Sequence, residues 1–371
     1  MFTKCLTFCH HEAGLDTLIP IFAAVNGFFL RYVGGEEALS NASMMKSLVL
    51  TEPGNFLWQN MPKPALLSEH HVLVKIKAIG VCGTDIHAYH GRQPFFSYPR
   101  ILGHELGVEV METGSGVKNL QPGDRCSVEP YLNCGECHPC LKGKSNCCEN
   151  IQVLGVHADG GMTEYLVVPA NKLHRSEKLS FKELAVVETY GIGCHAVARA
   201  AVQETDKVLV IGAGPIGITT IDFARIAGAE VHVLDINEDR LAFCEKHGKG
   251  TIFLSTPPAD NQYDVVFDAT GHPESMKQAL KYLAHGGRLV FIGLFQGDYS
   301  FHDPYFHKKE TTLLSSRNAL PGDFRRIIGL IENGSLNLTP FITEEVSFAD
   351  TPQFFAELPG KKNLIKAVIN L

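Results

Sequence analysis

The sequence predicts an α/β protein in which a β-rich domain is joined to a doubly wound parallel sheet. Residues 45–188 are rich in Gly and Pro and contain short strands separated by long loops. Near Thr205 the pattern changes abruptly to buried strands that alternate with helices, which is typical of a parallel sheet covered on both faces. The length of 371 residues suits two domains.

The expected strands follow from apolar runs. The run KVLVI at 207–211 predicts a buried parallel strand, and a helical pattern then extends to Ala227. The other expected strands are residues 46–50, 72–79, 230–234, 264–268, 288–292 and 364–369. We assign residues 45–188 and 326–371 to the β-rich domain and residues 189–325 to the parallel-sheet domain.

Residues 1–44 lack a sustained apolar period. We expect a leader that is disordered or that comes from an upstream start codon, with a targeting role as the alternative. The uncharged apolar stretch 18–30 is shorter than the roughly 20 residues that cross a bilayer. Because Glu12 and Asp16 precede it, a signal peptide is not expected.

Composition argues against two further classes of protein. The net charge of −7 comes without a basic stripe, so no nucleic-acid partner is expected. The 11 cysteines are odd in number, and four of them cluster at metal-ligand spacing, which favours metal binding over a disulfide framework. We therefore predict a cytoplasmic protein without a membrane partner.

A glycine-rich turn between the KVLVI strand and the following helix predicts a Rossmann-type dinucleotide site. The first glycine permits a tight turn, the second lets the backbone approach a pyrophosphate, and the third allows the helix to pack closely on the strand. The N-terminus of the helix adds a positive dipole. The turn consists of Gly212, Ala213, Gly214, Pro215, Ile216 and Gly217.

Asp235 ends the next strand, about 20 residues beyond the glycine-rich turn. A carboxylate there accepts hydrogen bonds from ribose hydroxyls and repels a 2′-phosphate, so NAD is predicted rather than NADP. Arg240 lies over the adenine or is an ordinary charge on the helix surface, and the sequence leaves both interpretations open.

Four cysteines give the sharpest motif. Thiolates at this spacing fold a loop around one tetrahedral Zn²⁺ and leave no open position, so we predict a structural zinc. An iron–sulfur cluster is the alternative, and Cys147 competes for the fourth place. The predicted ligands are Cys134, Cys137, Cys140 and Cys148.

A second group of candidate ligands is scattered along the chain. Cys82 lies in GVCGTD, and His104 and Glu105 follow Gly103. Together they supply soft and borderline ligands for a catalytic zinc that keeps one position open for substrate. Glu188 is the candidate for a further ligand.

These motifs have the order and approximate spacing of the zinc-containing medium-chain alcohol dehydrogenases, which residues 45–371 resemble. The likeness is greatest to the polyol, threonine and hexonate dehydrogenases, which have Glu where liver-type enzymes have Cys. Residues 93–99, 307–311 and 316–318 are similar to L-galactonate 5-dehydrogenases, and residues 155–161 to their L-gulonate-oxidising relatives.

The resemblance implies a GroES-like catalytic domain, a Rossmann domain and an active site in the cleft between them. It implies zinc ligands at Cys82, His104 and Glu105, with Glu188 as a ligand or directly beside them. It also implies a dimer or tetramer. Two departures stand out, because Thr189 replaces a common Pro and the leader has no counterpart.

The resemblance also implies a proton relay. A zinc-bound hydroxyl has a lowered pKa, and the alkoxide passes a hydride to the nicotinamide. Thr84 takes the proton and passes it through the cofactor ribose to His87 and solvent. Asp85 is expected to be a local cap.

The predicted reaction is therefore oxidation by NAD of a secondary alcohol on a small polar substrate, a sugar acid such as L-galactonate. Arg317 and Lys309 are candidates to hold its carboxylate, with ordinary surface charges as the alternative. Loops around Phe95, Tyr131 and Phe295 are expected to shape the pocket. A threonine or polyol dehydrogenase is the alternative within the enzymes. The alternative outside them is a non-catalytic NAD-binding protein, which would lack a ligand or relay residue.

Overall fold

The computed structural model describes residues 43–94, 96–361 and 363–371. Most of the predicted leader, residues 1–42, lies outside these ranges, as does Phe95. Of the leader's last two residues, Ser43 is described and Met44 begins the first strand. Among the described residues, no helix is both long enough and apolar enough to cross a membrane.

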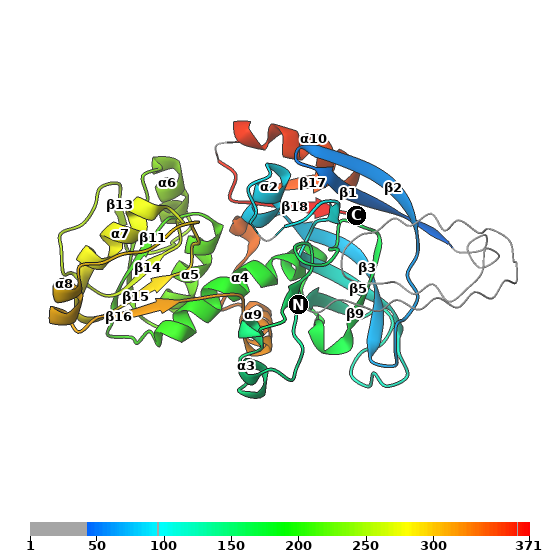
Figure 1. Cartoon of the computed structure of the whole chain (residues 1–371), viewed down its shortest axis with the longest axis horizontal. Helices are drawn as coiled ribbons and strands as arrows, with labels where there is room; N and C mark the ends of the chain where they lie inside the picture. The colour runs from blue at the N-terminus through cyan, green and yellow to red at the C-terminus, as the bar shows by residue number, and fades with distance from the viewer. Residues whose placement is uncertain (1–42, 95, 362) are drawn as a thin grey trace, which may run out of the picture. The chain divides into compact units, whose positions relative to one another are not determined.

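The β-rich region contains two principal sheets (Figure 1). The three-stranded sheet has the order β2 (Asn55–Pro62), β1 (Met44–Glu52) and β4 (Arg100–Ile101). The seven-stranded sheet has the order β10 (Leu173–Ser176), β6 (Arg125–Val128), β5 (Glu105–Thr113), β3 (His71–Gly80), β18 (Lys366–Asn370) and β17 (Ile342–Ser347), and β9 (Tyr165–Pro169) also pairs with β3. The predicted C-terminal strand thus joins the seven-stranded sheet of the β-rich region, because β18 pairs with β3.

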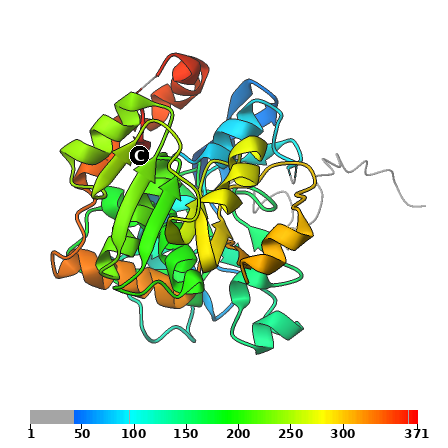
Figure 2. The ribbon, with the colours of Figure 1, turned by 90° about the vertical axis from the view of Figure 1, so that its left-hand side faces the viewer.

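The second region is a parallel sheet of six strands (Figure 2). Its order is β13 (Ile252–Leu254), β12 (Glu230–Leu234), β11 (Lys207–Ile211), β14 (Tyr263–Asp268), β15 (Leu283–Phe291) and β16 (Thr312–Ser315). In chain order this is 3-2-1-4-5-6, the strand order of a Rossmann domain, which confirms the predicted fold.

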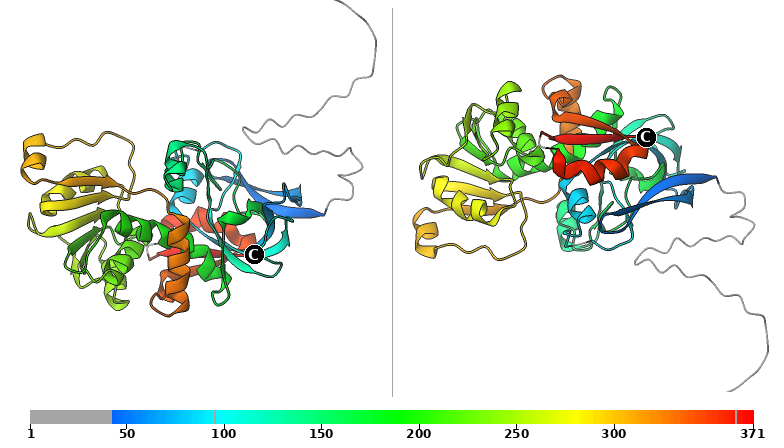
Figure 3. Two further views of the ribbon diagram at one scale, coloured as in Figure 1. Left: turned by 90° about the horizontal axis from the view of Figure 1, so that it is seen from below. Right: turned by 90° about the horizontal axis from the view of Figure 1, so that it is seen from above.

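Helices cover both faces of the parallel sheet (Figures 2 and 3). Along β11 the side chains alternate, so that Val208 and Val210 join the core shared with α4 (Phe181–Ala200) and α5 (Pro215–Ile226). Leu209 and Ile211 join the core shared with α7 (Pro273–Tyr282). The continuous apolar run KVLVI is therefore explained by burial on both faces.

Helix α4 contacts both the seven-stranded and the parallel sheet, since it packs on β3, β5 and β6 of the first, on β15 of the second, and on α5. It begins with a capping box between Ser180 and Glu183. A Cβ at Gly107 of β5 would lie 2.0 Å from the carbonyl oxygen of Phe181, so glycine permits this close approach. Thr189, at the position where relatives commonly have Pro, lies inside α4 without interrupting it, and the predicted boundary between 188 and 189 falls within this helix.

The remaining elements are the two strands β7 and β8 and the other helices. They are α2 (Gly83–Tyr89), β7 (Tyr131–Leu132), α3 (His138–Leu141), η1 (Ser145–Cys147), β8 (Gln152–Val153), η2 (Ala170–Lys172), α6 (Glu238–Lys246), α8 (Asp303–Lys308), α9 (Pro321–Glu332), η3 (Thr339–Phe341), η4 (Phe348–Asp350), α10 (Thr351–Glu357) and η5 (Leu358–Gly360).

Candidate active site and metal centres

Strand pairing brings the scattered candidate ligands together. Strands β3 and β5 are antiparallel, and Gly80 pairs with Glu105 at their ends. Cys82 follows β3 as the N-cap of α2, and His104 precedes β5. One ligand atom from each of Cys82, His104 and Glu105 lies within 4.8 Å of the others, and His104 and Glu105 are buried. This group is called the buried centre below.

The surroundings of the Glu105 carboxylate leave one of its oxygens available to a cation. Lys366 donates from Nζ to Glu105 Oε1 at 2.5 Å and to the carbonyl of Val81 at 3.0 Å. The second oxygen, Oε2, is buried without a hydrogen-bond partner among the described residues. A Cβ at position 80 would lie 2.0 Å from Oε2, so Gly80 makes room for it. An unpartnered buried carboxylate oxygen beside a thiol and an imidazole fits a zinc ion.

Sequence reasoning missed Lys366. Burial alone would lower the pKa of Lys366, but Glu105 and Cys82 outweigh it and raise the pKa. Its only local signal was a lysine inside the predicted apolar strand 364–369, and a single lysine in a strand is ordinarily a solvated charge.

Asp85 supports the buried centre from α2. Its Oδ2 accepts from the Cys82 amide at 3.0 Å, as the predicted local cap requires. Its Oδ1 lies 3.6 Å from His104 Nδ1. Burial opposes charge on the ring, yet Asp85 and Cys82 hold the pKa of His104 well above its usual value. With Nδ1 facing Asp85, the other ring nitrogen is free to bind a metal.

Glu188 lies on α4 outside the group of three ligand atoms. Tyr131 donates its hydroxyl hydrogen to Glu188 Oε1, and both side chains are buried. Burial raises the pKa of Glu188, and the nearby Glu105 carboxylate raises it further, while His104 lowers it. Direct ligation by Glu188 stays a prediction.

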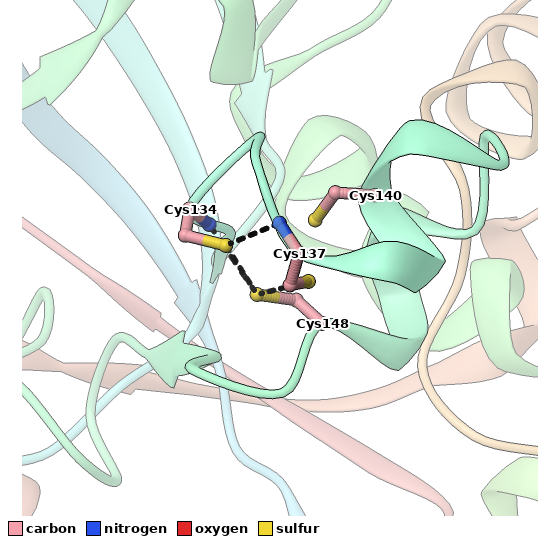
Figure 4. A group of neighbouring side chains, drawn as sticks. All are labelled: Cys134, Cys137, Cys140 and Cys148. Atoms are coloured by element: carbon pink, nitrogen blue, oxygen red, sulfur yellow. Dashed lines mark hydrogen bonds between the residues drawn. The ribbon is translucent and has the colours of Figure 1, made fainter.

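The four predicted cysteines of the second motif form another group, called the cysteine lobe below (Figure 4). Their sulfur atoms lie within 4.8 Å of one another, and Cys148 Sγ is 3.5 Å from Cys134 Sγ and 3.8 Å from Cys137 Sγ. Hydrogen bonds from the amides of Glu136 and Cys137 lower the pKa of Cys134 to about 6, which favours a thiolate ligand. Cys148 rather than the exposed Cys147 joins the group. Four converging sulfurs would hold one zinc ion in a closed site, with no position left for substrate.

The glycine-rich turn has the predicted form. Gly212 has φ +95, and a Cβ at Gly217 would lie 1.7 Å from the Gly212 carbonyl oxygen. Pro215 and Ile216 open α5, and Gly214 is its N-cap.

The ribose-binding candidate Asp235 folds towards this turn. Its Oδ2 accepts from the Ala213 amide at 2.7 Å, and Arg240 lies 3.8 Å from the same oxygen. The Arg240 side chain is 41% exposed, so an ion pair with Asp235 and contact with an adenine are both open to it.

The relay candidates share one face of α2. Thr84 and His87 are three residues apart, a spacing that makes side chains neighbours on a helix. Thr84 is half-buried and His87 is exposed, as a path from the buried centre to solvent requires. Their roles stay predictions.

One expectation is wrong. Lys309 is buried, and its Nζ donates to the carbonyl oxygens of Leu280, at 3.1 Å, and of Leu283. It therefore stabilises the end of α7 and does not bind a substrate carboxylate. Arg317, in contrast, is exposed.

Two family models match the chain. Residues 68–178 match the alcohol dehydrogenase GroES-like domain, and residues 215–333 match the zinc-binding dehydrogenase family.

Individual proteins match over most of their length. The chain is 38% identical to the L-galactonate-5-dehydrogenase of Escherichia coli K12 over 88% of this chain and 99% of that protein. It is 31% identical to a probable D-xylulose reductase A of Aspergillus clavatus, over 86% of this chain and 94% of that protein. A crystal structure of the E. coli CFT073 alcohol dehydrogenase RspB, complexed with NADH, matches with a TM-score of 0.82 and 29% sequence identity. The match covers 89% of this chain and 100% of that chain.

Proposed function

Because the chain belongs to the zinc-containing medium-chain alcohol dehydrogenase family, we propose that it oxidises a secondary hydroxyl of a hexonate such as L-galactonate with NAD. The similarity to L-galactonate-5-dehydrogenase carries the choice of substrate. The buried centre supports the reaction class, because a thiolate, an imidazole and a carboxylate leave one position of a tetrahedral zinc open.

When bound, zinc polarises the substrate hydroxyl and lowers its pKa, and NAD accepts the hydride. Around that reaction the chain supplies orientation and charge. Asp85 orients His104, and Lys366 offsets the charge of Glu105. Thr84 would accept the hydroxyl proton while passing its own through the cofactor ribose to His87, which would release a proton to solvent.

The nucleotide domain holds NAD through the glycine-rich turn. Amides at the N-terminus of α5 face the pyrophosphate, and Asp235 accepts hydrogen bonds from the ribose hydroxyls. A buried carboxylate there repels a 2′-phosphate, which supports NAD over NADP.

The substrate carboxylate is assigned to Arg317. Among the described residues, no carboxylate forms an ion pair with this exposed guanidinium. A planar guanidinium matches a carboxylate through two parallel hydrogen bonds.

A neutral polyol is the second candidate substrate, because the chain also resembles a D-xylulose reductase. Arg317 distinguishes the two, since a polyol has no carboxylate to pair with it. A non-catalytic NAD-binding protein would lack a ligand, whereas Cys82, His104 and Glu105 converge here. We further propose a cytoplasmic homodimer or homotetramer.

The test is NADH absorbance after mixing zinc-replete full-length protein with NAD and each of L-galactonate, L-gulonate, sorbitol and L-threonine. We expect NADH with a hexonate, little with NADP, and none from Cys82→Ala. Turnover of sorbitol but of neither hexonate would support the polyol dehydrogenase. Silence from a folded, zinc-replete sample would refute both.

A further inference from the structure

A partly buried chain of hydrogen bonds joins the cysteine lobe to the turn that carries Arg317. Asn146 lies in the lobe within η1, and it is buried. Its side-chain nitrogen donates to His195 Nε2 and to the carbonyl oxygen of Arg317, both at 3.0 Å. Both amide hydrogens are thereby used. The backbone carbonyl of Asn146 also accepts from Asn318 Nδ2 at 3.3 Å.

The chain continues through α4 to α9. Because the Asn146 nitrogen can only donate, His195 Nε2 accepts and the ring hydrogen sits on Nδ1. Nδ1 lies 3.1 Å from Asp323 Oδ2 and donates to it. The same oxygen accepts from the Leu320 amide at 2.8 Å. One connected network therefore holds both ends of the turn 317–320.

The turn depends on such support. Asn318 has φ +56, a left-handed conformation that costs an L-residue about 1 kcal/mol. Its side-chain bond to Asn146 helps to hold it there. Without the network, the turn would relax and the direction of the Arg317 side chain would no longer be fixed.

The 155–161 loop lies against the backbone that precedes His104. Burial lowers the pKa of His157 in this loop, and the charges of Arg317 and Arg100 lower it further. That loop packs on the same backbone, since the Gly161 amide donates to the Gly103 carbonyl at 2.8 Å.

We propose that the cysteine lobe is a positioning element for substrate recognition, in which Asn146, supported by His195 and Asp323, fixes the turn that presents Arg317. The carboxylate as the target of Arg317 rests on the proposed function, whereas the support of the turn by the lobe does not. Asn146 and His195 are positioning residues and do not touch the substrate.

Hydrogen exchange tests the support of the turn without using activity. In zinc-replete full-length protein, Asn146→Ala should speed amide exchange in peptides covering 315–322 about tenfold, the loss expected for roughly one buried hydrogen bond. Lys144→Ala, an exposed change in the same lobe, should leave exchange unchanged. His195→Ala removes the link between Asn146 and Asp323 and should also speed exchange in 315–322. This second variant keeps the test available if Asn146→Ala fails to fold.

Metal analysis completes this test, because both zinc ions should remain in Asn146→Ala and His195→Ala. Unchanged exchange at 315–322 in zinc-replete Asn146→Ala would overturn the proposal. Faster exchange throughout the Rossmann domain would also overturn it, because a general loss of stability would then explain the result.

A double-mutant cycle tests the link to Arg317. Asn146→Ala should raise KM for L-galactonate about three- to tenfold with little change in kcat, and leave the inhibition constant of sorbitol unchanged. In an Arg317→Ala background the same substitution should have no further effect. Additive effects, or equal effects on both ligands, would contradict the link. If no hexonate is oxidised, the proposed function fails, and hydrogen exchange still decides the role of the lobe.

Discussion

The two metal centres of this chain are built differently. The cysteine lobe takes four thiolates from one short stretch, residues 134–148, and three of its sulfur ligands belong to half-buried or exposed residues. The buried centre takes three different ligand types from the ends of two paired strands. Behind its ligands stand Asp85 and Lys366, both buried.

This difference follows from what each centre has to do. A closed thiolate site can be folded by the metal itself, so it needs only a loop. A centre that keeps a position open for substrate must hold its ligands by other means, here by the sheet and by partners behind the ligands. Four substitutions test whether the two centres are separate in this way.

His104→Ala should have the largest effect. It should lower kcat/KM roughly 10³-fold, because several kcal/mol of Lewis-acid stabilisation are lost. One zinc equivalent should disappear and the other remain in the cysteine lobe. His138→Ala, which removes an exposed imidazole beside Cys137, should keep both. Loss of both ions in His104→Ala would show that the centres are coupled.

Lys366→Met should have the second-largest effect. It leaves the Glu105 carboxylate buried without its partner, which should cost about 3–5 kcal/mol of unfolding free energy measured with urea. The matched control is Lys361→Met. Its partly exposed pair with Glu344 should contribute about 0–1 kcal/mol. Similar losses in both variants would mean that the Lys366 pair does not support the buried centre.

Cys137→Ser should disrupt the cysteine lobe. One zinc equivalent is lost, and the melting temperature should fall by about 5 °C, which corresponds to roughly 2 kcal/mol. Cys147→Ser should keep both zinc ions, since Cys147 stands outside the group. Loss of zinc from Cys147→Ser instead would reopen the identity of the fourth ligand.

Asp85→Asn should have the smallest effect of the four. Weakening the contact with His104 should lower zinc affinity at the buried centre about tenfold, as measured by competition with a chelator. The cysteine lobe should release its zinc at the unchanged chelator concentration. An equal shift at both centres would argue against a local role for Asp85.

The contrast between the centres also explains what could be read from the sequence. Strands β11 and β12 were predicted residue for residue, because buried parallel strands are continuous apolar runs. The ligands of the cysteine lobe could also be predicted from the sequence, since all four lie within one short stretch. The sequence also favoured Cys148 over its neighbour Cys147, and the geometry of the loop confirms that choice.

Contacts between residues far apart in the chain could not be predicted from the sequence. Lys366 meets Glu105 across 261 residues, and no local pattern reports that β18 will pair with β3. Lys309 was misjudged because a lysine beside a charged run resembles a surface residue, whereas its Nζ binds buried carbonyls. The network around Asn146 likewise joins three segments that only the fold brings together.

The most direct test of the division of labour between the two centres is the visible spectrum of the cobalt-substituted full-length enzyme. Bands absent from His104→Ala belong to the buried centre, and bands absent from Cys137→Ser belong to the cysteine lobe. We predict that L-galactonate with NADH shifts only the first set. A shift confined to the bands of the cysteine lobe, or no shift in either set, would contradict substrate binding at the buried centre.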